Sequence, residues 1–134
     1  RFGDPETQVV LPRLKTDLVE IVNATVTKKL KGLLIELIDK TTITVVIASK
    51  GYPGKFEKGL ELPPLNQELQ KSDISIFHSG TAKNKNGKLI SNGGRVLSVT
   101  AMGNDVQDCR KKAYNAVENI NWHEGFYRKD IGRL

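Results

Sequence analysis

The sequence is poor in the residue types on which several classes of protein depend. Its single cysteine, Cys109, cannot form a disulfide within the chain, and this fits a reducing compartment such as the cytoplasm. Its two histidines, His78 and His123, do not have the spacing of a metal-binding motif such as HExxH. Aromatic residues make up 6% of the chain, which leaves few rings to stack on nucleic-acid bases. No apolar run reaches the ~20 residues of a membrane-spanning helix. We therefore expect no metal ligands in this chain, and neither nucleic acid nor a membrane as a partner.

Complete catalytic motifs are also missing. The sequence has no CxxC pair and no nucleophile elbow. Gly80 and the pair Gly87-Lys88 have the wrong spacing for a phosphate-binding P-loop, and no Ser or Thr follows the lysine. The glycines between positions 51 and 59 do not follow the GxGxxG order of a dinucleotide site. The chain therefore does not contain a whole active site of any of these kinds.

A positive net charge is the clearest compositional feature. The 134 residues carry 21 Lys and Arg side chains against 15 Asp and Glu, which gives a net charge of +6. The basic residues form short clusters at 28–29, 83–88, 110–112 and 128–129. These clusters fit either an ordinary solvated surface or the attraction of an anionic, phosphorylated small substrate. With 38% hydrophobic and 27% charged residues, the composition is that of a folded chain of one domain, or one domain and a piece of another.

Two helices are predicted in the first 32 residues. Asp4 can cap the first helix, and Pro5 suits its first position because the missing N–H has no partner there. Pro12 should end this helix about one residue earlier. The second helix should open near Asp17 and stop near Gly32. Its apolar side chains have the spacing of one buried face, formed by Leu18, Ile21, Val22, Thr25 and Leu30.

Strands and one further helix are predicted in the rest of the chain. The β-branched run 41–47 indicates a buried strand, and segments 74–77 and 95–102 indicate two more. Asn86-Gly87 predicts a hairpin with a tight primed turn between residues 81–83 and 89–90. A helix should run from 104 to about 120, with Asn104 and Gln107 as its capping box and Cys109 on its core face. We expect an α+β fold, with a small bent or barrel-like antiparallel sheet and one packed helix.

Five segments, in order along the whole chain, resemble phosphoribosylamine–glycine ligase, also called glycinamide ribonucleotide synthetase, a family of the ATP-grasp superfamily. They are residues 1–8 (RFGDPETQ), 48–54 (ASKGYPG), 77–81 (FHSGT), 92–97 (NGGRVL) and 127–132 (YRKDIG). Ser79 stands where the family usually has alanine. Each segment alone is short, but their shared order makes the resemblance specific.

The resemblance implies that the chain is the carboxy-terminal part of an ATP-dependent carbon–nitrogen ligase. Residues 1–32 would be two helices left over from the ATP-grasp domain, and residues 33–134 the substrate-contacting domain. The family uses ATP and Mg²⁺ or Mn²⁺ to convert glycine to an acyl phosphate. The amine of 5-phosphoribosylamine then attacks it to give glycinamide ribonucleotide, in de novo purine biosynthesis. The ATP site and the metal ligands, an acidic residue and an asparagine just before Arg1, would lie outside this chain. We therefore expect an inactive fragment of a monomeric cytoplasmic enzyme.

Site residues follow from the same resemblance. Arg1 would lie against the activated carboxylate, which a guanidinium matches in shape and charge, and would be catalytic. Arg95 would grip the ribose 5-phosphate, and Gly93-Gly94 before it would allow close approach of the backbone. Of Arg128 and Lys129, one would contact phosphate, and the sequence does not choose between them. The predicted substrate-binding residues are thus Asp4, Gly93, Gly94, Arg95, Arg128 and Lys129.

Two other functions fit parts of the sequence. The net charge and a barrel-like sheet fit a freestanding basic module that binds RNA or another polyanion. A scaffold domain without catalytic partner is the third possibility, but it gives Arg1 and the Gly93-Gly94-Arg95 turn no purpose. For most single residues the structural reading also stays open: Asp4 as a helix cap, and the basic pair 128–129 as solvent-facing side chains.

Overall fold

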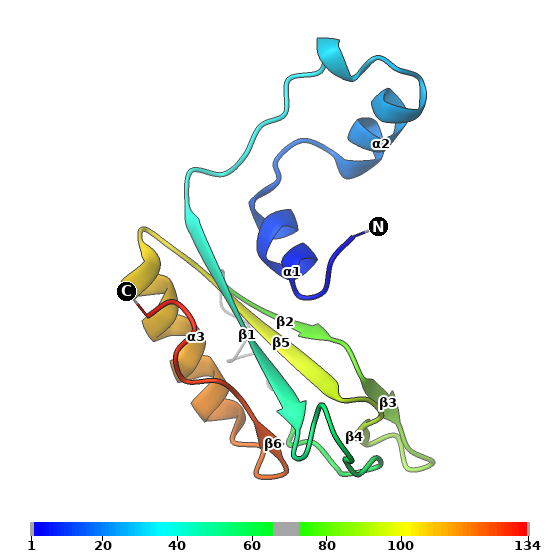
Figure 1. Cartoon of the computed structure of the whole chain (residues 1–134), viewed down its shortest axis with the longest axis vertical. Helices are drawn as coiled ribbons and strands as arrows, with labels where there is room; N and C mark the ends of the chain where they lie inside the picture. The colour runs from blue at the N-terminus through cyan, green and yellow to red at the C-terminus, as the bar shows by residue number, and fades with distance from the viewer. Residues whose placement is uncertain (1, 66–72, 134) are drawn as a thin grey trace.

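A four-stranded antiparallel sheet organises the fold (Figure 1). The computed structural model describes residues 2–65 and 73–133. The β-branched run predicted as a strand forms β1 (Thr41–Ser49), which pairs with β5 (Arg95–Gly103) along its length. Strand β2 (Ile74–His78) pairs with the other edge of β5, and the two-residue β6 (Gly125–Phe126) pairs with the end of β1. The order of strands in the sheet is therefore β2-β5-β1-β6.

One face of this sheet forms the hydrophobic core with helix α3 (Val106–Ile120). Register pairs Val45 with Val99, and both side chains are fully buried. Alternate residues of a strand point to the same face, so the residues two positions away on β1 and β5 also face the helix. Full burial of one such aliphatic side chain is worth about 1.5–3 kcal/mol. The helix contributes Cys109, Ala113, Ala116, Val117 and Ile120.

The cap of α3 differs by one residue from the prediction. Asp105, not Asn104, is the N-cap, and its carboxylate accepts the Asp108 N–H at 2.7 Å. The Asp108 carboxylate in turn accepts the Asn104 N–H at 3.2 Å. The predicted capping box of Asn104 and Gln107 is thus wrong. The carboxylates of Asp105 and Asp108, one position later in the chain, accept these N–H groups instead. The predicted core position of Cys109 is confirmed.

Helix α1 (Glu6–Val10) packs on the opposite face of the sheet, followed by a 3₁₀ turn at Leu11–Arg13. Carbonyl groups at the end of a helix have no partner within it. Here the Thr42 hydroxyl donates to the Val9 carbonyl at 2.9 Å, and the Thr100 hydroxyl donates to the Gln8 carbonyl at the same distance. Threonines of the sheet therefore hold α1 in place. Pro5 is the N-cap rather than the first helical residue, and Asp4 makes no capping bond.

The predicted hairpin forms, but with another turn. Strands β3 (Thr81–Lys83) and β4 (Leu89–Ser91) make a separate two-stranded sheet. Of Asn86 and Gly87, only Gly87 has a positive φ, of 76°. The Asn84 carboxamide oxygen accepts the N–H groups of Asn86 and Lys88 at 2.9 and 3.0 Å. A type I′ turn needs positive φ at both central residues and a type II′ turn needs it at the first, which here is Asn86. The predicted primed turn is therefore wrong: Asn84 closes the loop instead, and Gly87 alone takes the left-handed conformation.

The segment before β1 is different. Helix α2 (Leu18–Val26) begins at Asp17, whose carboxylate accepts the Val19 N–H at 2.7 Å, and a 3₁₀ turn follows at Leu30–Gly32. No described residue before position 41 is buried. The predicted buried face of α2 is therefore wrong in this structure: Val22 is 45% and Leu30 40% exposed. Figure 1 shows α2 at the end of the molecule farthest from the sheet, and none of its side chains belongs to the hydrophobic core.

The predicted α+β class is confirmed, with two amino-terminal helices, an antiparallel sheet and one packed helix. The described strands form an open sheet and a hairpin and do not close into a barrel. Among residues 2–65 and 73–133, no helix is long and apolar enough to cross a membrane.

Candidate functional site

A cavity of about 220 Å³ lies beside the start of α1, on the same face of the sheet as that helix. Its floor comes from β1, and its walls come from the start of α1, from the loop after β1 and from the segment after β6. The lining residues are Pro5, Thr44, Val46, Ala48, Tyr52, Arg95, Phe126, Tyr127, Arg128 and Ile131. Two of the predicted site residues, Arg95 and Arg128, thus line the same cavity. A third, Asp4, is the residue directly before Pro5, which also lines it.

Arg95 joins the sheet to the segment that enters α1. Its Nη1 donates to the Asp4 carbonyl at 2.7 Å, and its Nε lies 3.6 Å from the Asp4 carboxylate. The arginine side chain is 38% exposed. A guanidinium has five N–H donors in a planar fork. The Nη2 hydrogens take part in no hydrogen bond within the described part of the chain, so they remain able to bind a ligand at the cavity.

The glycines before Arg95 are required by contacts within the protein. A Cβ at Gly94 would lie 2.1 Å from the ring of Tyr52, and one at Gly93 would lie 3.0 Å from the Cα of Gly80. Ser49 fastens this turn, because its N–H donates to the Gly94 carbonyl at 2.8 Å and its hydroxyl donates to the Gly93 carbonyl at 3.0 Å. The turn therefore sets the position of both Tyr52 and Arg95 at the cavity. Direct contact of the two glycines with a ligand stays a prediction.

Arg128 and Lys129 have different surroundings. The Arg128 guanidinium binds Asp130 with two hydrogen bonds, of 3.0 Å from Nε and 2.5 Å from Nη2. This hydrogen bonding lowers the pKa of the Asp130 carboxyl and raises the pKa of Arg128. Lys129 does not line the cavity, and its carbonyl accepts a hydrogen bond from Arg110. Of this basic pair, Arg128 is therefore the residue that lies at the cavity.

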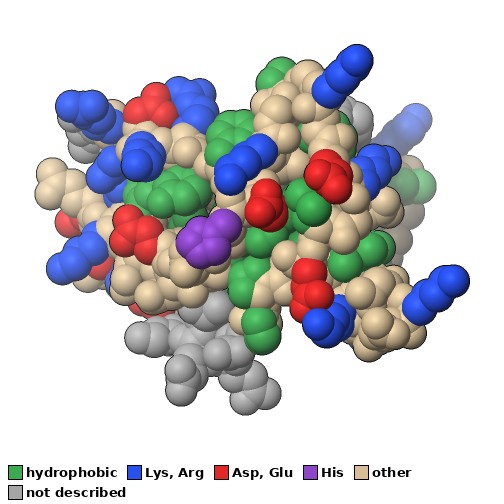
Figure 2. All heavy atoms as spheres, turned by 90° about the horizontal axis from the view of Figure 1, so that it is seen from below, with side chains coloured by type: hydrophobic (Ala, Val, Ile, Leu, Met, Phe, Trp, Pro, Cys, Tyr) green, Lys and Arg blue, Asp and Glu red, His purple; other side chains and the backbone are tan. Residues whose placement is uncertain are grey.

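The walls of the cavity are mainly apolar, and sequence reasoning missed most of them. Tyr127 and Ile131 belong to the segment YRKDIG, which resembles the family, whereas Val46 and Phe126 had no signal beyond hydrophobicity. Figure 2 shows this end of the molecule: Lys and Arg side chains are scattered over the face among acidic ones, with apolar surface between them. A small molecule with one anionic group, held by a guanidinium over an apolar floor, fits such a site.

One predicted site residue cannot be placed at this cavity, because Arg1 lies outside the described residues. No group of three or more His, Cys, Asp or Glu side chains that could hold a metal ion occurs within residues 2–65 and 73–133. The resemblance assigns the ligands of Mg²⁺ or Mn²⁺ to residues outside this chain, and that assignment stays a prediction.

Comparison with known proteins gives a consistent result. The family model described as "Phosphoribosylglycinamide synthetase, C domain" matches residues 42–134. A phosphoribosylamine–glycine ligase of Caldanaerobacter subterraneus is 45% identical over 98% of this chain and 30% of its own length. A trifunctional purine biosynthetic protein of Gallus gallus is 47% identical over 98% of this chain and 13% of its own length. The chain thus spans a third or less of these relatives.

A solved structure agrees with these matches. The crystal structure of a phosphoribosylamine–glycine ligase from Thermotoga maritima superimposes with a TM-score of 0.72 at 32% sequence identity. The superposition covers 97% of this chain and 31% of that one.

Proposed function

Because this chain belongs to the family of the phosphoribosylglycinamide synthetase C domain, we propose that it is the substrate-contacting part of an ATP-dependent ligase that joins glycine to 5-phosphoribosylamine. In this reaction the carboxylate of glycine is activated as glycyl phosphate. The amine of phosphoribosylamine then attacks the acyl carbon, phosphate leaves, and glycinamide ribonucleotide forms. The observation that carries the proposal is the match along nearly the whole chain to ligases that are about three times as long. The chain alone would then lack activity.

Arg95 is the main substrate contact that we propose. The Nη2 hydrogens not used within the described structure would bind the 5-phosphate of the substrate, while Nη1 stays on Asp4. A hydrogen bond to a charged group is worth about 1.5–3 kcal/mol, so loss of this one should weaken binding about tenfold to a hundredfold. Arg128 would assist from the other side of the cavity, but only one of its terminal nitrogens is not engaged with Asp130.

Asp4 would act by positioning rather than by touching substrate. Its carbonyl is tied to Arg95, and Arg1 lies three residues earlier in the chain. The resemblance assigns Arg1 to the activated carboxylate, where its charge would stabilise the negative charge of the transition state. The Arg95 link would therefore bring the catalytic arginine and the phosphate-binding arginine to one place. Gly93 and Gly94 would support it by fixing the turn, and Lys129 would add positive potential near Arg128.

The exposed segment before β1 fits the proposed domain division. Residues 1–32 would complete an ATP-grasp domain, and residues 33–134 would form the substrate domain. Apolar side chains on α2 and beyond it are unusually exposed for a folded protein: Val19 is 66%, Val26 75% and Leu34 78% exposed. Large contiguous apolar surface usually marks an interface. We expect the remainder of the ligase to cover it and to supply the sites for ATP and for the metal ion.

The compartment remains part of the proposal. One cysteine fits a reducing environment, and we expect the cytoplasm and a monomeric parent enzyme. A relative in Arabidopsis thaliana, 43% identical over 98% of this chain and 25% of its own length, is a chloroplastic ligase. Location therefore differs among members of the family.

A chimera tests the proposed function. This chain would replace the matching segment of the Caldanaerobacter ligase, and phosphoribosylamine would be generated in the assay from ribose 5-phosphate and ammonia. We expect glycine-dependent release of ADP from the chimera and none from the chain alone. A chimera that folds but makes no glycinamide ribonucleotide would contradict the proposal.

Variants of the chimera then test the site. Arg95→Ala should raise the KM for phosphoribosylamine about tenfold to a hundredfold, and leave the KM for ATP within about twofold. Arg95→Lys should raise the KM for phosphoribosylamine less than Arg95→Ala does, since lysine retains the charge but not the fork. Lys85→Ala, which removes an exposed cation of the β3–β4 loop that does not line the cavity, is the control and should change neither constant. Unchanged kinetics in Arg95→Ala would remove this residue from the site.

A further inference from the structure

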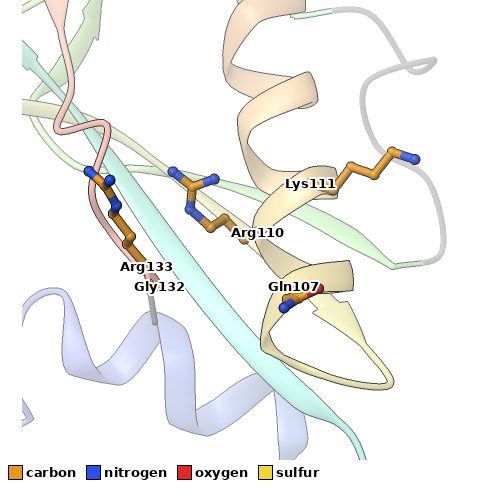
Figure 3. Close-up of a pocket in the computed structure, with 5 residues that line it drawn as sticks. All are labelled: Gln107, Arg110, Lys111, Gly132 and Arg133. Atoms are coloured by element: carbon orange, nitrogen blue, oxygen red, sulfur yellow. The ribbon is translucent and has the colours of Figure 1, made fainter.

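A second hollow, of about 490 Å³, lies between the first turns of α3 and the carboxy-terminal segment (Figure 3). Its lining residues are Gln107, Arg110, Lys111, Gly132 and Arg133. It shares no lining residue with the cavity of Arg95. Three cations and one carboxamide line it, and no carboxylate does so within the described chain. The hollow therefore has the chemistry of an anion site.

Arg110 is held in place before any ligand binds. Its Nε donates to the Ile131 carbonyl at 3.2 Å, and its Nη2 donates to the Lys129 carbonyl at 2.7 Å. Its guanidinium carbon also lies 4.8 Å from the centre of the Tyr114 ring. The Nη1 hydrogens make no hydrogen bond with described residues, so they are available to a ligand. Because the side chain is already ordered, binding to it costs less conformational entropy than binding to a free arginine.

Arg133 comes from a turn that faces Arg110. Its N–H donates to the Asp130 carbonyl at 3.1 Å, and Gly132 before it has a φ of 68°, which other residues rarely adopt. Figure 3 shows the guanidinium ends of Arg110 and Arg133 on the same side of α3, directed toward a common space. Lys111 leads away from both of them. The two arginines are therefore the centre of the hollow, and Gln107 and Lys111 are at its rim.

The acidic residues near the hollow are engaged elsewhere. Asp108 binds Lys112 at 2.9 Å, and Asp130 binds Arg128. Asp105 accepts the Asp108 N–H as the cap of α3. Arg110, Lys111 and Arg133 take part in none of the salt bridges among the described residues. Two guanidinium groups that face each other without a carboxylate between them repel, and an anion between them would reverse the sign of this interaction.

We propose that Arg110 and Arg133 bind the phosphate group of a small phosphorylated molecule at this hollow. The planar fork of Arg133 can bind two phosphate oxygens, and the Nη1 hydrogens of Arg110 can donate to a third. The volume is that of an ordinary small-molecule site, so it has room for a phosphate with a sugar attached. Inorganic phosphate and a sugar phosphate share the binding chemistry, and the experiment separates them. This proposal does not depend on the ligase activity.

The test is a titration of the isotopically labelled chain, followed through its backbone amide NMR signals. Inorganic phosphate and ribose 5-phosphate are added separately at constant ionic strength, with chloride as the reference salt. We expect saturable shifts of residues 107–111 and 130–133 with both ligands. Tighter binding of ribose 5-phosphate would indicate that the sugar also contacts the site, and equal binding would indicate that the phosphate alone is recognised.

Two matched variants give the decisive comparison. Arg133→Ala should weaken binding about tenfold or more, because it removes one of the two charged forks. Lys111→Ala removes the same charge from the rim and should weaken binding less than about threefold. Equal effects of the two variants would show non-specific attraction and overturn the proposal. Shifts that do not saturate, or that map to the Arg95 cavity instead, would overturn it as well.

Discussion

Residues 2–40 and residues 41–133 follow the same chemical rules but reach different results. Both contain helices with good aspartate caps and apolar side chains at helical spacing. The second region buries its apolar side chains between α3 and the sheet, and every buried residue of the described chain lies there. The first region buries none, and its large apolar side chains stay exposed. Local sequence signals therefore predict helices equally well in both regions. Only the second region also contains the sheet that buries the apolar face of its helix.

The largest test of this difference places the same charge in each region. Val99→Asp would bury a carboxylate without a partner in the centre of the sheet, and we expect a loss of more than about 3 kcal/mol and no folded signal. Val26→Asp makes the same change at a side chain that is 75% exposed, and should alter the free energy of unfolding by less than about 0.5 kcal/mol. Circular dichroism with urea denaturation measures both. A folded Val99→Asp protein would contradict the assigned core.

A second pair of variants compares two glycines. A methyl group at Gly94 would overlap the Tyr52 ring, so Gly94→Ala should cost about 1–3 kcal/mol. At Gly32 a Cβ would meet nothing within 4 Å, and Gly32→Ala should be neutral or slightly stabilising through the unfolded state. Thermal unfolding of the two variants checks this. Equal melting temperatures would show that the turn before Arg95 is not tightly packed.

A third pair removes the helix caps. Asp105→Ala takes the cap from α3 and should lower the free energy of unfolding by about 0.5–2 kcal/mol. Asp17→Ala takes the equivalent cap from α2 and should lower the helix content without changing the unfolding transition of the core. Urea denaturation gives the first quantity and far-ultraviolet circular dichroism the second. A shift of the core transition in Asp17→Ala would mean that the two regions unfold together.

The smallest effect concerns pH. Lys112 binds Asp73 at 2.8 Å and Asp108 at 2.9 Å, and these hydrogen bonds lower the pKa of both carboxyls. A carboxyl group whose pKa is lower in the folded state stabilises the protein at pH values above its unfolded pKa of about 4. This stabilisation is lost as the pH falls through the pKa of the folded state. Thermal stability should therefore decrease from about pH 5 to about pH 3. Lys112→Met should flatten this dependence, and Lys111→Met should leave it unchanged. The reverse ranking would contradict the assignment.

The same comparison shows where sequence reasoning succeeds. β-Branched residues identified β1, and the spacing of apolar residues identified α3, although its cap lies one residue later than predicted. Both elements match a local pattern to a partner within the chain. The buried face of α2 was predicted by the same periodicity and is exposed. Periodicity shows that a face is apolar and does not show what covers it. The turn at Asn86-Gly87 failed for another reason, since Asn84 competes for the loop through its side chain.

The candidate site was partly predictable as well. The segments that resemble the ligase family pointed to Arg95 and to one of Arg128 and Lys129, and the structure brings Arg95 and Arg128 to one cavity. The link from Arg95 to Asp4 joins residues 91 positions apart, and no local pattern indicates it. The ring of Tyr52 against Gly94 is likewise a tertiary contact. Sequence reasoning thus named residues of the site, whereas the packing of α1 on β1 and β5 decides how they meet.

Amide hydrogen exchange of the intact chain tests the difference between the two regions most directly. We expect the central amides of β1 and β5 to exchange only by global unfolding, with protection of about 10⁴-fold or more, as a stability above about 5 kcal/mol implies. The amides of α2 should show less than about tenfold protection, because α2 contributes no buried residue that would oppose its local opening. Equal protection of α2 and the sheet would contradict our proposal that α2 depends on a partner outside this chain.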